Sequence, residues 1–225
     1  LELCGGALSS PSFDEGALGR EKEVQRADLL ESLQDPLKTS FRLLRESLFG
    51  YQNYGLPMLG TEESLNNIDR GMLQEHHQKF ITRENGVLAI FGDINPGQII
   101  EICNRVFASL PKGRKSNAPG DEASQPSPSD IVHNLNKEQT VVTVGYPGAH
   151  ITSEDIPALE VIHEYCSNMA GPLFTRMREE LGLAYYVNAT QFHGFGKGLF
   201  AFYIGTAPDK AALARQELLT QIEIL

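Results

Sequence analysis

The sequence has few cysteines, no apolar run that reaches the length of a bilayer, and no excess of positive charge. Its three cysteines, Cys4, Cys103 and Cys166, are widely spaced without a C-x-x-C pair, which argues against a disulfide framework or a zinc knuckle and predicts core thiols. No apolar run approaches the ~18 residues that a membrane-spanning helix needs, so we expect no membrane insertion. Nineteen Lys and Arg against 29 Asp and Glu give a net charge of −10, which argues against nucleic acid as a partner.

Several catalytic motifs are also missing. The sequence contains no P-loop, no G-x-S-x-G and no G-x-G-x-x-G, and neither H-E-x-x-H nor H-x-x-E-H occurs in it. His76 and His77 are adjacent on a predicted helix and therefore point about 100° apart, which is typical of a solvated face rather than of one metal site. The first residues lack an initiator Met and a basic leader, so we expect the chain to begin within a longer protein, and the compartment is not indicated.

What is present is the composition of a globular chain, with 41% hydrophobic and 21% charged residues. At ~150 residues per domain, 225 residues correspond to about one and a half domains. Helical periodicity runs through the first fifty residues with a break at Pro36, and a polar helix is predicted over Ser64 to Phe80. The apolar run from Gly86 to Phe91 predicts a buried strand, and Asn95 followed by Pro96 predicts the start of the next helix.

The second half of the chain has a different composition. Between Pro111 and Asp130, Pro, Ser, Gly and charged residues predominate, which predicts a linker. Beyond it, the patterns predict a strand from Thr140 to Tyr146, a helix from Glu154 to Met169, two hairpin strands over Leu183 to Phe192 and Gly198 to Gly205, and a final helix from Pro208. This order predicts an α+β fold of two related part-lobes, each an antiparallel or mixed sheet covered by helices on one face.

One segment carries a composite motif. Residues Gly171 to Val187 read G-P-L-F-T-R-M-R-E-E-L-G-L-A-Y-Y-V, with Arg178 near the end of a short helix and Tyr185 seven residues later. This segment resembles the L-F-x-x-x-R-x-x-x-G-L-A-Y stretch of the insulinase/pitrilysin family of inverted-motif zinc peptidases, which includes the mitochondrial processing peptidases. Tyr54-Gly55-Leu56-Pro57, Gly60 to Ser64 and Gly92-Asp93 are similar to the family's pattern as well, so the resemblance covers nearly the whole chain.

The resemblance implies a clamshell protease in which Arg178 and Tyr185 contact the peptide substrate or the transition state. The family's zinc site takes two His from H-x-x-E-H and a Glu from an acidic helix, which resembles the segment from Glu21 to Pro36 here. By that spacing the third-ligand position falls on Asp28, whose side chain is one methylene shorter, so we interpret Asp28 as a remnant of a metal site. Glu31 lies one turn away and takes that position only in a shifted register.

The sequence therefore predicts the non-catalytic, substrate-contacting half of a zinc metalloendopeptidase. Residues 1–115 are the C-terminal part of a first lobe, 116–130 the linker, and 131–225 the N-terminal part of a second lobe. Zinc is expected in the partner lobe, in cis or in trans, with none in this chain, which is expected to be inactive by itself. Two alternatives stay open: an active zinc peptidase whose H-x-x-E-H lies upstream of Leu1, and a non-enzymatic scaffold of the same fold.

Overall fold

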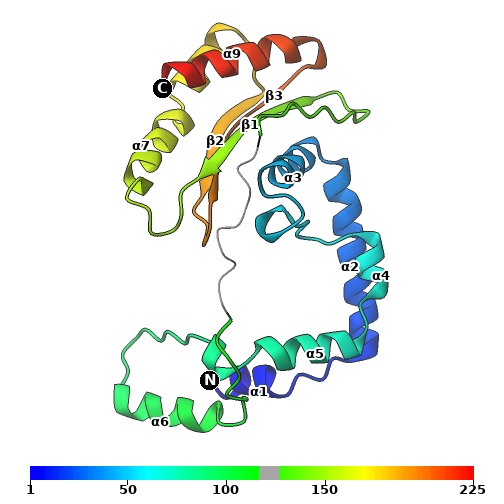
Figure 1. Cartoon of the computed structure of the whole chain (residues 1–225), viewed down its shortest axis with the longest axis vertical. Helices are drawn as coiled ribbons and strands as arrows, with labels where there is room; N and C mark the ends of the chain where they lie inside the picture. The colour runs from blue at the N-terminus through cyan, green and yellow to red at the C-terminus, as the bar shows by residue number, and fades with distance from the viewer. Residues whose placement is uncertain (117–126) are drawn as a thin grey trace. The chain divides into compact units, whose positions relative to one another are not determined.

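The computed structural model describes residues 1–116 and 127–225, so most of the predicted linker, residues 117–126, lies outside the described residues (Figure 1). The described chain forms two compact units, one of residues 1–27 and 61–116 and the other of residues 28–60 and 127–225. We call them unit 1 and unit 2. The first unit is helical, and the second contains a three-stranded sheet with helices.

The helices of unit 1 are α1 (Glu2–Ser9), the first part of α2 (Glu15–Gln34), α4 (Glu62–Asn67), α5 (Arg70–Phe80) and α6 (Pro96–Val106), with a short turn η2 (Arg83–Asn85). Three of them, α4, α5 and α6, begin after a residue whose side chain caps the helix. As predicted, Asn95 caps α6 by accepting from the Gln98 amide at 3.2 Å, and Pro96 follows at its first position.

Two predictions for unit 1 are wrong. The helix predicted over Ser64 to Phe80 is divided into α4 and α5, because the Asp69 carboxylate accepts from the Met72 amide at 2.8 Å and starts a new helix. The predicted strand from Gly86 to Phe91 is not part of any sheet in the described chain. A strand needs a partner for its backbone groups, and unit 1 contains no other extended segment that pairs with this one.

Unit 2 is built on an antiparallel sheet of β1 (Thr140–Gly148), β2 (Tyr186–Phe192) and β3 (Gly198–Thr206) in the order β1-β3-β2. Side chains of β3 alternate between two cores. Phe200, Phe202 and Ile204 pack with α7 (Ile156–Ser167) and α9 (Ala211–Ile224) and with the segment between α7 and β2, which contains α8 (Pro172–Phe174) and η3 (Thr175–Glu180). A 3-10 turn, η4 (Pro208–Lys210), leads from β3 into α9.

The opposite face of the sheet is covered by α3 (Pro36–Phe49) and η1 (Asn53–Gly55). Leu199 and Ala201 of β3 contact Phe49 there, and the rings of Phe41 and Tyr203 meet edge to face at 5.3 Å. Gly145 permits this approach, because a Cβ at that position would lie 2.5 Å from Leu44 Cδ1. The α+β class is confirmed, and helices cover both faces of this sheet.

The start of α3 follows the prediction from Pro36. The Asp35 carboxylate caps α3 by accepting from the amides of Leu37 and Lys38 at 2.8 and 2.9 Å. Since α3 packs on β1, residues 28–60 join the second half of the chain in one compact unit. The lobe boundaries at 1–115, 116–130 and 131–225 stay predictions about the whole protein.

Several element ends differ from the sequence prediction. β2 begins at Tyr186, three residues later than predicted, because the amides of Leu183 and Ala184 bond to Met177 O instead of joining the sheet. The helix predicted from Glu154 to Met169 is shorter, at Ile156–Ser167. Of the three cysteines only Cys166 lies in a core; its burial raises the pKa of the thiol, whereas Cys4 is exposed on α1.

No helix within residues 1–116 and 127–225 combines the length and the apolar character needed to cross a bilayer.

The packing of α9 predicts a clear stability difference between two leucines of that helix. Leu218 is fully buried, so Leu218→Ala leaves a cavity and should lower the free energy of unfolding by about 2–5 kcal/mol. Leu213 lies on the same helix at 55% exposure, and Leu213→Ala should change that free energy by less than about 0.5 kcal/mol. Urea unfolding of both variants measures the difference, and equal losses would contradict the packing described for α9.

Candidate functional site

Arg178 and Tyr185, the two residues singled out by the sequence motif, lie next to each other. An Nη of Arg178 donates to the backbone carbonyl of Tyr185 at 3.2 Å. The guanidinium also lies over the Phe174 ring at 5.2 Å from its centroid. Both contacts hold the cation at the point where the chain enters β2, and the contact with an aromatic face is a favourable cation–π arrangement.

The backbone around this pair is fixed on both sides. The Tyr185 amide donates to Gly205 O of β3 at 2.8 Å, and the amide of Leu183 donates to Met177 O at 2.8 Å. Gly182 makes the turn between η3 and these residues with a φ of +57°, a conformation that favours glycine. Met177 itself is fully buried. The two side chains are therefore mounted on a rigid turn rather than on a loose loop.

A second pair of contacts ties η3 to the last helix. Arg176 bonds to Glu217 of α9 at 2.9 Å and to Glu180 at 2.7 Å. These hydrogen bonds raise the pKa of the Arg176 guanidinium further above its usual value, Glu180 having the larger effect. Because Arg176 points to α9, the two arginines of the motif have different roles: Arg176 holds the turn, and Arg178 lies beside Tyr185.

The pair is accessible from solvent. The Tyr185 side chain is 54% exposed, and Arg178 is exposed as well. Within the described part of the chain, Arg178 forms no ion pair with a carboxylate, although Glu179 and Glu180 follow it in sequence. A guanidinium has five N–H donors, so Arg178 retains donors and a full positive charge for an external acceptor.

Sequence analysis missed Phe174 as a component of this site. The contact between Phe174 and Arg178 could have been predicted, because the two residues are four positions apart, the spacing at which side chains of a helical turn meet. The hydrogen bond from Arg178 to the Tyr185 carbonyl could not be predicted from the sequence pattern, since it depends on the geometry of the turn at Gly182.

Asp28, at the family's third-ligand position, is exposed on α2 near a lysine. Lys38 bonds to Glu31 at 2.8 Å, and this hydrogen bond raises the pKa of the lysine ammonium, with further contributions from the charges of Asp35 and Asp28. Glu31, the alternative ligand of a shifted register, is therefore paired with a cation. The charge of the Lys38 ammonium disfavours a cation at Asp28, and the interpretation of Asp28 as a remnant of a metal site stays a prediction.

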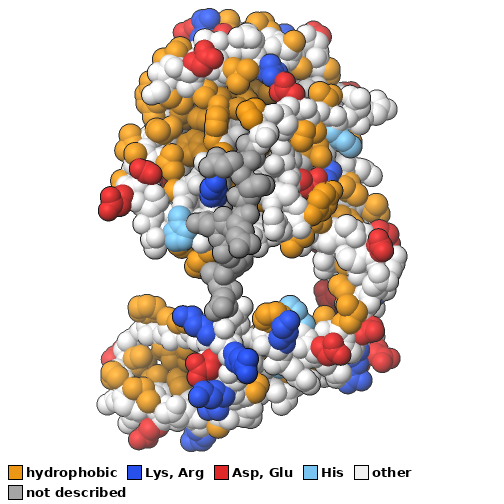
Figure 2. All heavy atoms as spheres, viewed as in Figure 1, with side chains coloured by type: hydrophobic (Ala, Val, Ile, Leu, Met, Phe, Trp, Pro, Cys, Tyr) orange, Lys and Arg blue, Asp and Glu red, His pale blue; other side chains and the backbone are white. Residues whose placement is uncertain are grey.

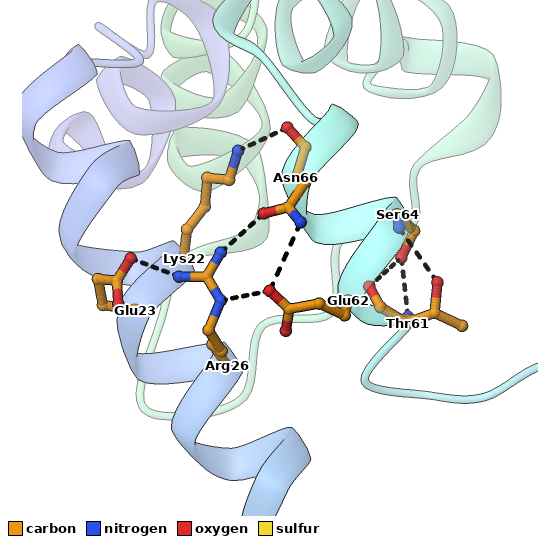
Figure 3. A network of polar contacts seen from close by, with 7 residues as sticks. All are labelled: Lys22, Glu23, Arg26, Thr61, Glu62, Ser64 and Asn66. Atoms are coloured by element: carbon orange, nitrogen blue, oxygen red, sulfur yellow. Dashed lines mark hydrogen bonds and ion pairs between the residues drawn. The ribbon is translucent and has the colours of Figure 1, made fainter.

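The part of α2 that precedes Asp28 is fastened by a polar network in unit 1 (Figure 3). Lys22 donates to the backbone carbonyls of Asn66 and Ile68 at 3.2 and 2.9 Å. Arg26 donates to Glu62 at 2.7 Å, to the Asn66 side chain at 2.9 Å, and to Glu23 on its own helix. Lys22 thus binds the carbonyls at the C-terminal end of α4, where it faces the negative end of the helix dipole, whereas Arg26 binds side chains at both ends of α4, Glu62 and Asn66. In residues 1–116 and 127–225, no three His, Cys, Asp or Glu side chains are grouped in a way that could hold a metal.

The chain is similar to peptidases of one family. Residues 67–225 match the family model described as "Peptidase M16 inactive domain". An uncharacterised zinc protease of Rickettsia bellii is 27% identical over 99% of this chain and 54% of its own length, and one of Bacillus subtilis is 26% identical over 93% and 51%. The chain therefore spans about half the length of the curated relatives it matches.

Solved structures share its fold. A peptidase M16 inactive domain from Pseudomonas fluorescens superposes with a TM-score of 0.89 at 22% identity, over 99% of this chain and 55% of that one. Pitrilysin superposes with a TM-score of 0.60 at 15% identity, over 95% of this chain and 24% of pitrilysin. At these identities the superpositions show the fold alone.

The surroundings of Asp28 predict the metal content of the chain. A catalytic zinc site needs three protein ligands, so the purified 225-residue chain should hold no stoichiometric zinc after dialysis. Elemental analysis measures this directly. One tightly held zinc per chain that disappears in the Asp28→Ala variant would contradict the prediction.

Proposed function

The chain belongs to the peptidase M16 family, and we propose that it is the non-catalytic, substrate-contacting half of a zinc metalloendopeptidase. The observation that carries this proposal is the exposed pair of Arg178 and Tyr185, held together by a hydrogen bond at the start of β2. This is an arrangement of two donors that face solvent from a rigid turn, as a surface that receives a peptide requires.

In this proposal the Tyr185 hydroxyl acts on the reacting carbonyl. When water attacks a peptide bond, the carbonyl oxygen gains negative charge, and a phenol O–H can donate a hydrogen bond to it. A donor that is already positioned needs no reorganisation during the reaction. The backbone amide of Tyr185 is tied to Gly205, which fixes the residue that carries the hydroxyl.

Arg178 binds the peptide in the same proposal. Its planar guanidinium suits a carboxylate or a backbone carbonyl of the substrate, and two parallel hydrogen bonds to one such group give orientation as well as affinity. Phe174 and the Tyr185 carbonyl hold the guanidinium in place, so little side-chain entropy remains to be lost on binding.

The other half of the protease provides the chemistry that this chain lacks. An H-x-x-E-H segment in that half would hold zinc, which when bound would supply an activated water and polarise the carbonyl. The names of the relatives as zinc proteases, and the matched family model described as an inactive domain, support this division of roles. This chain positions the peptide and stabilises the charge that develops on it.

Kinetics on the complete protease test the roles of the two residues. Tyr185→Phe removes one donor to the oxyanion and should lower kcat by about 10²–10³-fold with the fold intact. Arg178→Ala removes a substrate anchor and should raise KM as well as lower kcat/KM. Steady-state rates with a peptide substrate, together with thermal melts, provide the readout.

Tyr186→Phe is the matched control. Tyr186 is the next residue, but successive residues of a strand point to opposite faces, and its ring packs toward Gly205 and Tyr203. Its loss of a hydroxyl should leave kcat unchanged. Unchanged turnover in Tyr185→Phe would reduce the pair to structural residues and contradict the proposed action of this half on the reacting carbonyl.

A further inference from the structure

The helical segment that precedes Gly182 contains a π turn. α8 and η3 follow each other without a break, and the amide of Leu181 donates to the carbonyl of Arg176, five residues earlier, at 3.1 Å. In an α-helix this amide would bond four residues back, to the carbonyl of Met177. Single π turns are rare and are frequently found at functional sites, so this turn calls for a physical explanation.

The π turn leaves the Met177 carbonyl free for other donors. Met177 O accepts from the amides of Leu183 and Ala184 at 2.8 and 3.2 Å. A carbonyl oxygen has two lone pairs, so these two amides use its full capacity. An α-helical bond from Leu181 to the same oxygen would displace one of them, and the chain that leads into Tyr185 would lose a bond that fixes it. The helical register of η3 therefore determines where Tyr185 lies.

The same register determines where Arg178 lies. Successive residues of an α-helix are rotated by about 100° around its axis, so a turn with one residue fewer would rotate Arg178 relative to Phe174. In the present register the guanidinium lies 5.2 Å from the centroid of the Phe174 ring and donates to the Tyr185 carbonyl at 3.2 Å. Both members of the candidate pair thus depend on one turn.

Two side chains from the last part of the described chain hold this turn at its start and at its end. Glu217 of α9 accepts from Arg176 Nε at 2.9 Å, and Gln221 donates to the same oxygen of Glu217 at 3.0 Å. The Glu217 side chain is only 16% exposed, so its bond is less screened by water than a bond on the open surface. At the other end, Lys210 Nζ of η4 donates to the carbonyl of Gly182 at 3.1 Å.

The helix that carries Glu217 is itself fixed. Ala214 and Leu218 of α9 are fully buried, and they belong to the same core as Met177 of η3. Figure 2 shows acidic and basic side chains close together on the surface over α9. Hydrophobic packing therefore holds η3 on its inner side, and polar contacts with α9 and η4 hold it on the other side.

We infer that Glu217 and Lys210 are positioning residues for the pair of Arg178 and Tyr185, and that they act by holding η3 in its π-helical register. This inference rests on the proposed function, in which the pair contacts the peptide. Loss of Glu217 removes the acceptor that fixes Arg176 and allows the turn to return to the α-helical register. The two functional side chains then leave their positions, while the core stays intact.

Kinetics of the complete protease with a peptide substrate test this inference. Glu217→Ala should lower kcat/KM by about 10²-fold, which is the loss expected when a functional group is displaced by about 1 Å. Thermal melts should show that the variant is folded. Glu217→Gln keeps an acceptor oxygen for Arg176 and should retain most of the activity. Lys210→Met removes the donor to Gly182 and keeps the aliphatic part of the side chain, and it should lower kcat/KM as well.

A double-mutant cycle separates positioning from a purely structural role. In a protease that already carries Arg178→Ala and Tyr185→Phe, the groups to be positioned are absent, so Glu217→Ala should lower kcat/KM further by less than about 3-fold. An equal loss in both backgrounds would show that Glu217 acts elsewhere and would overturn the inference. If Glu217→Ala does not fold, Lys210→Met takes its place in the same cycle.

Glu223→Ala is the matched control, because Glu223 is an exposed glutamate of the same helix. It should change neither kcat/KM nor the melting temperature, and a loss equal to that of Glu217→Ala would contradict the assignment. Full activity of Glu217→Ala and Lys210→Met, beside losses in Arg178→Ala and Tyr185→Phe, would overturn the inference and leave the proposed function standing. Unchanged rates in Arg178→Ala and Tyr185→Phe would contradict the proposed function and the inference together.

Discussion

Antiparallel pairing of β3 with strands on both of its sides is the interaction on which unit 2 depends. β1 and β2 bond to opposite edges of β3, and its alternating side chains fill one core under α7 and α9 and another under α3. A central strand that is buried on both faces brings together elements distant in sequence, from Phe41 to Leu218. The same pairing fixes the start of β2, because the Tyr185 amide bonds to Gly205 at the end of β3.

The position of the candidate site follows from this constraint. β2 is an edge strand, and the turn before it is held by Gly182, by the two amides that bond to Met177 O, and by the contacts of Arg176 with α9. Arg178 and Tyr185 lie on this turn with their side chains toward solvent. The core thus holds the backbone of the candidate site while it leaves the side chains of Arg178 and Tyr185 exposed, an arrangement that suits the proposed role in binding.

Local chemistry allowed much of the fold to be predicted from the sequence. The helix break at Pro36 and the start of α6 at Pro96 are confirmed. In both places a capping side chain, Asp35 or Asn95, is followed by a proline, and both residues act on the part of the chain next to them. Non-local packing was harder to predict. The sequence gives no sign that α3 covers the second face of the sheet, since that depends on the fit of Leu44 against Gly145. Residues 86–91 were predicted as a strand from their apolar run, yet a strand requires partners that unit 1 does not contain.

In the candidate site, too, some features could be predicted from the sequence and others could not. The motif identified Arg178 and Tyr185, and their contact depends on a turn that the glycine at position 182 indicates. The family resemblance implied that Asp28 stands at a third-ligand position, but the sequence did not indicate that Lys38 pairs with Glu31, one turn away. Sequence spacing identified the residues of each site, whereas the charges around them became evident from the structure.

Photo-crosslinking in the complete protease tests most directly whether this half contacts the substrate. A photoreactive amino acid replaces Tyr185 in an enzyme whose zinc has been removed, and a labelled peptide substrate is added. The comparison position is Tyr165, an equally exposed tyrosine on α7, at 57% against 54%. Transfer of the peptide label to position 185 and not to position 165 is the predicted result. Equal labelling at both positions, or none at 185, would contradict the role of this half in binding the peptide.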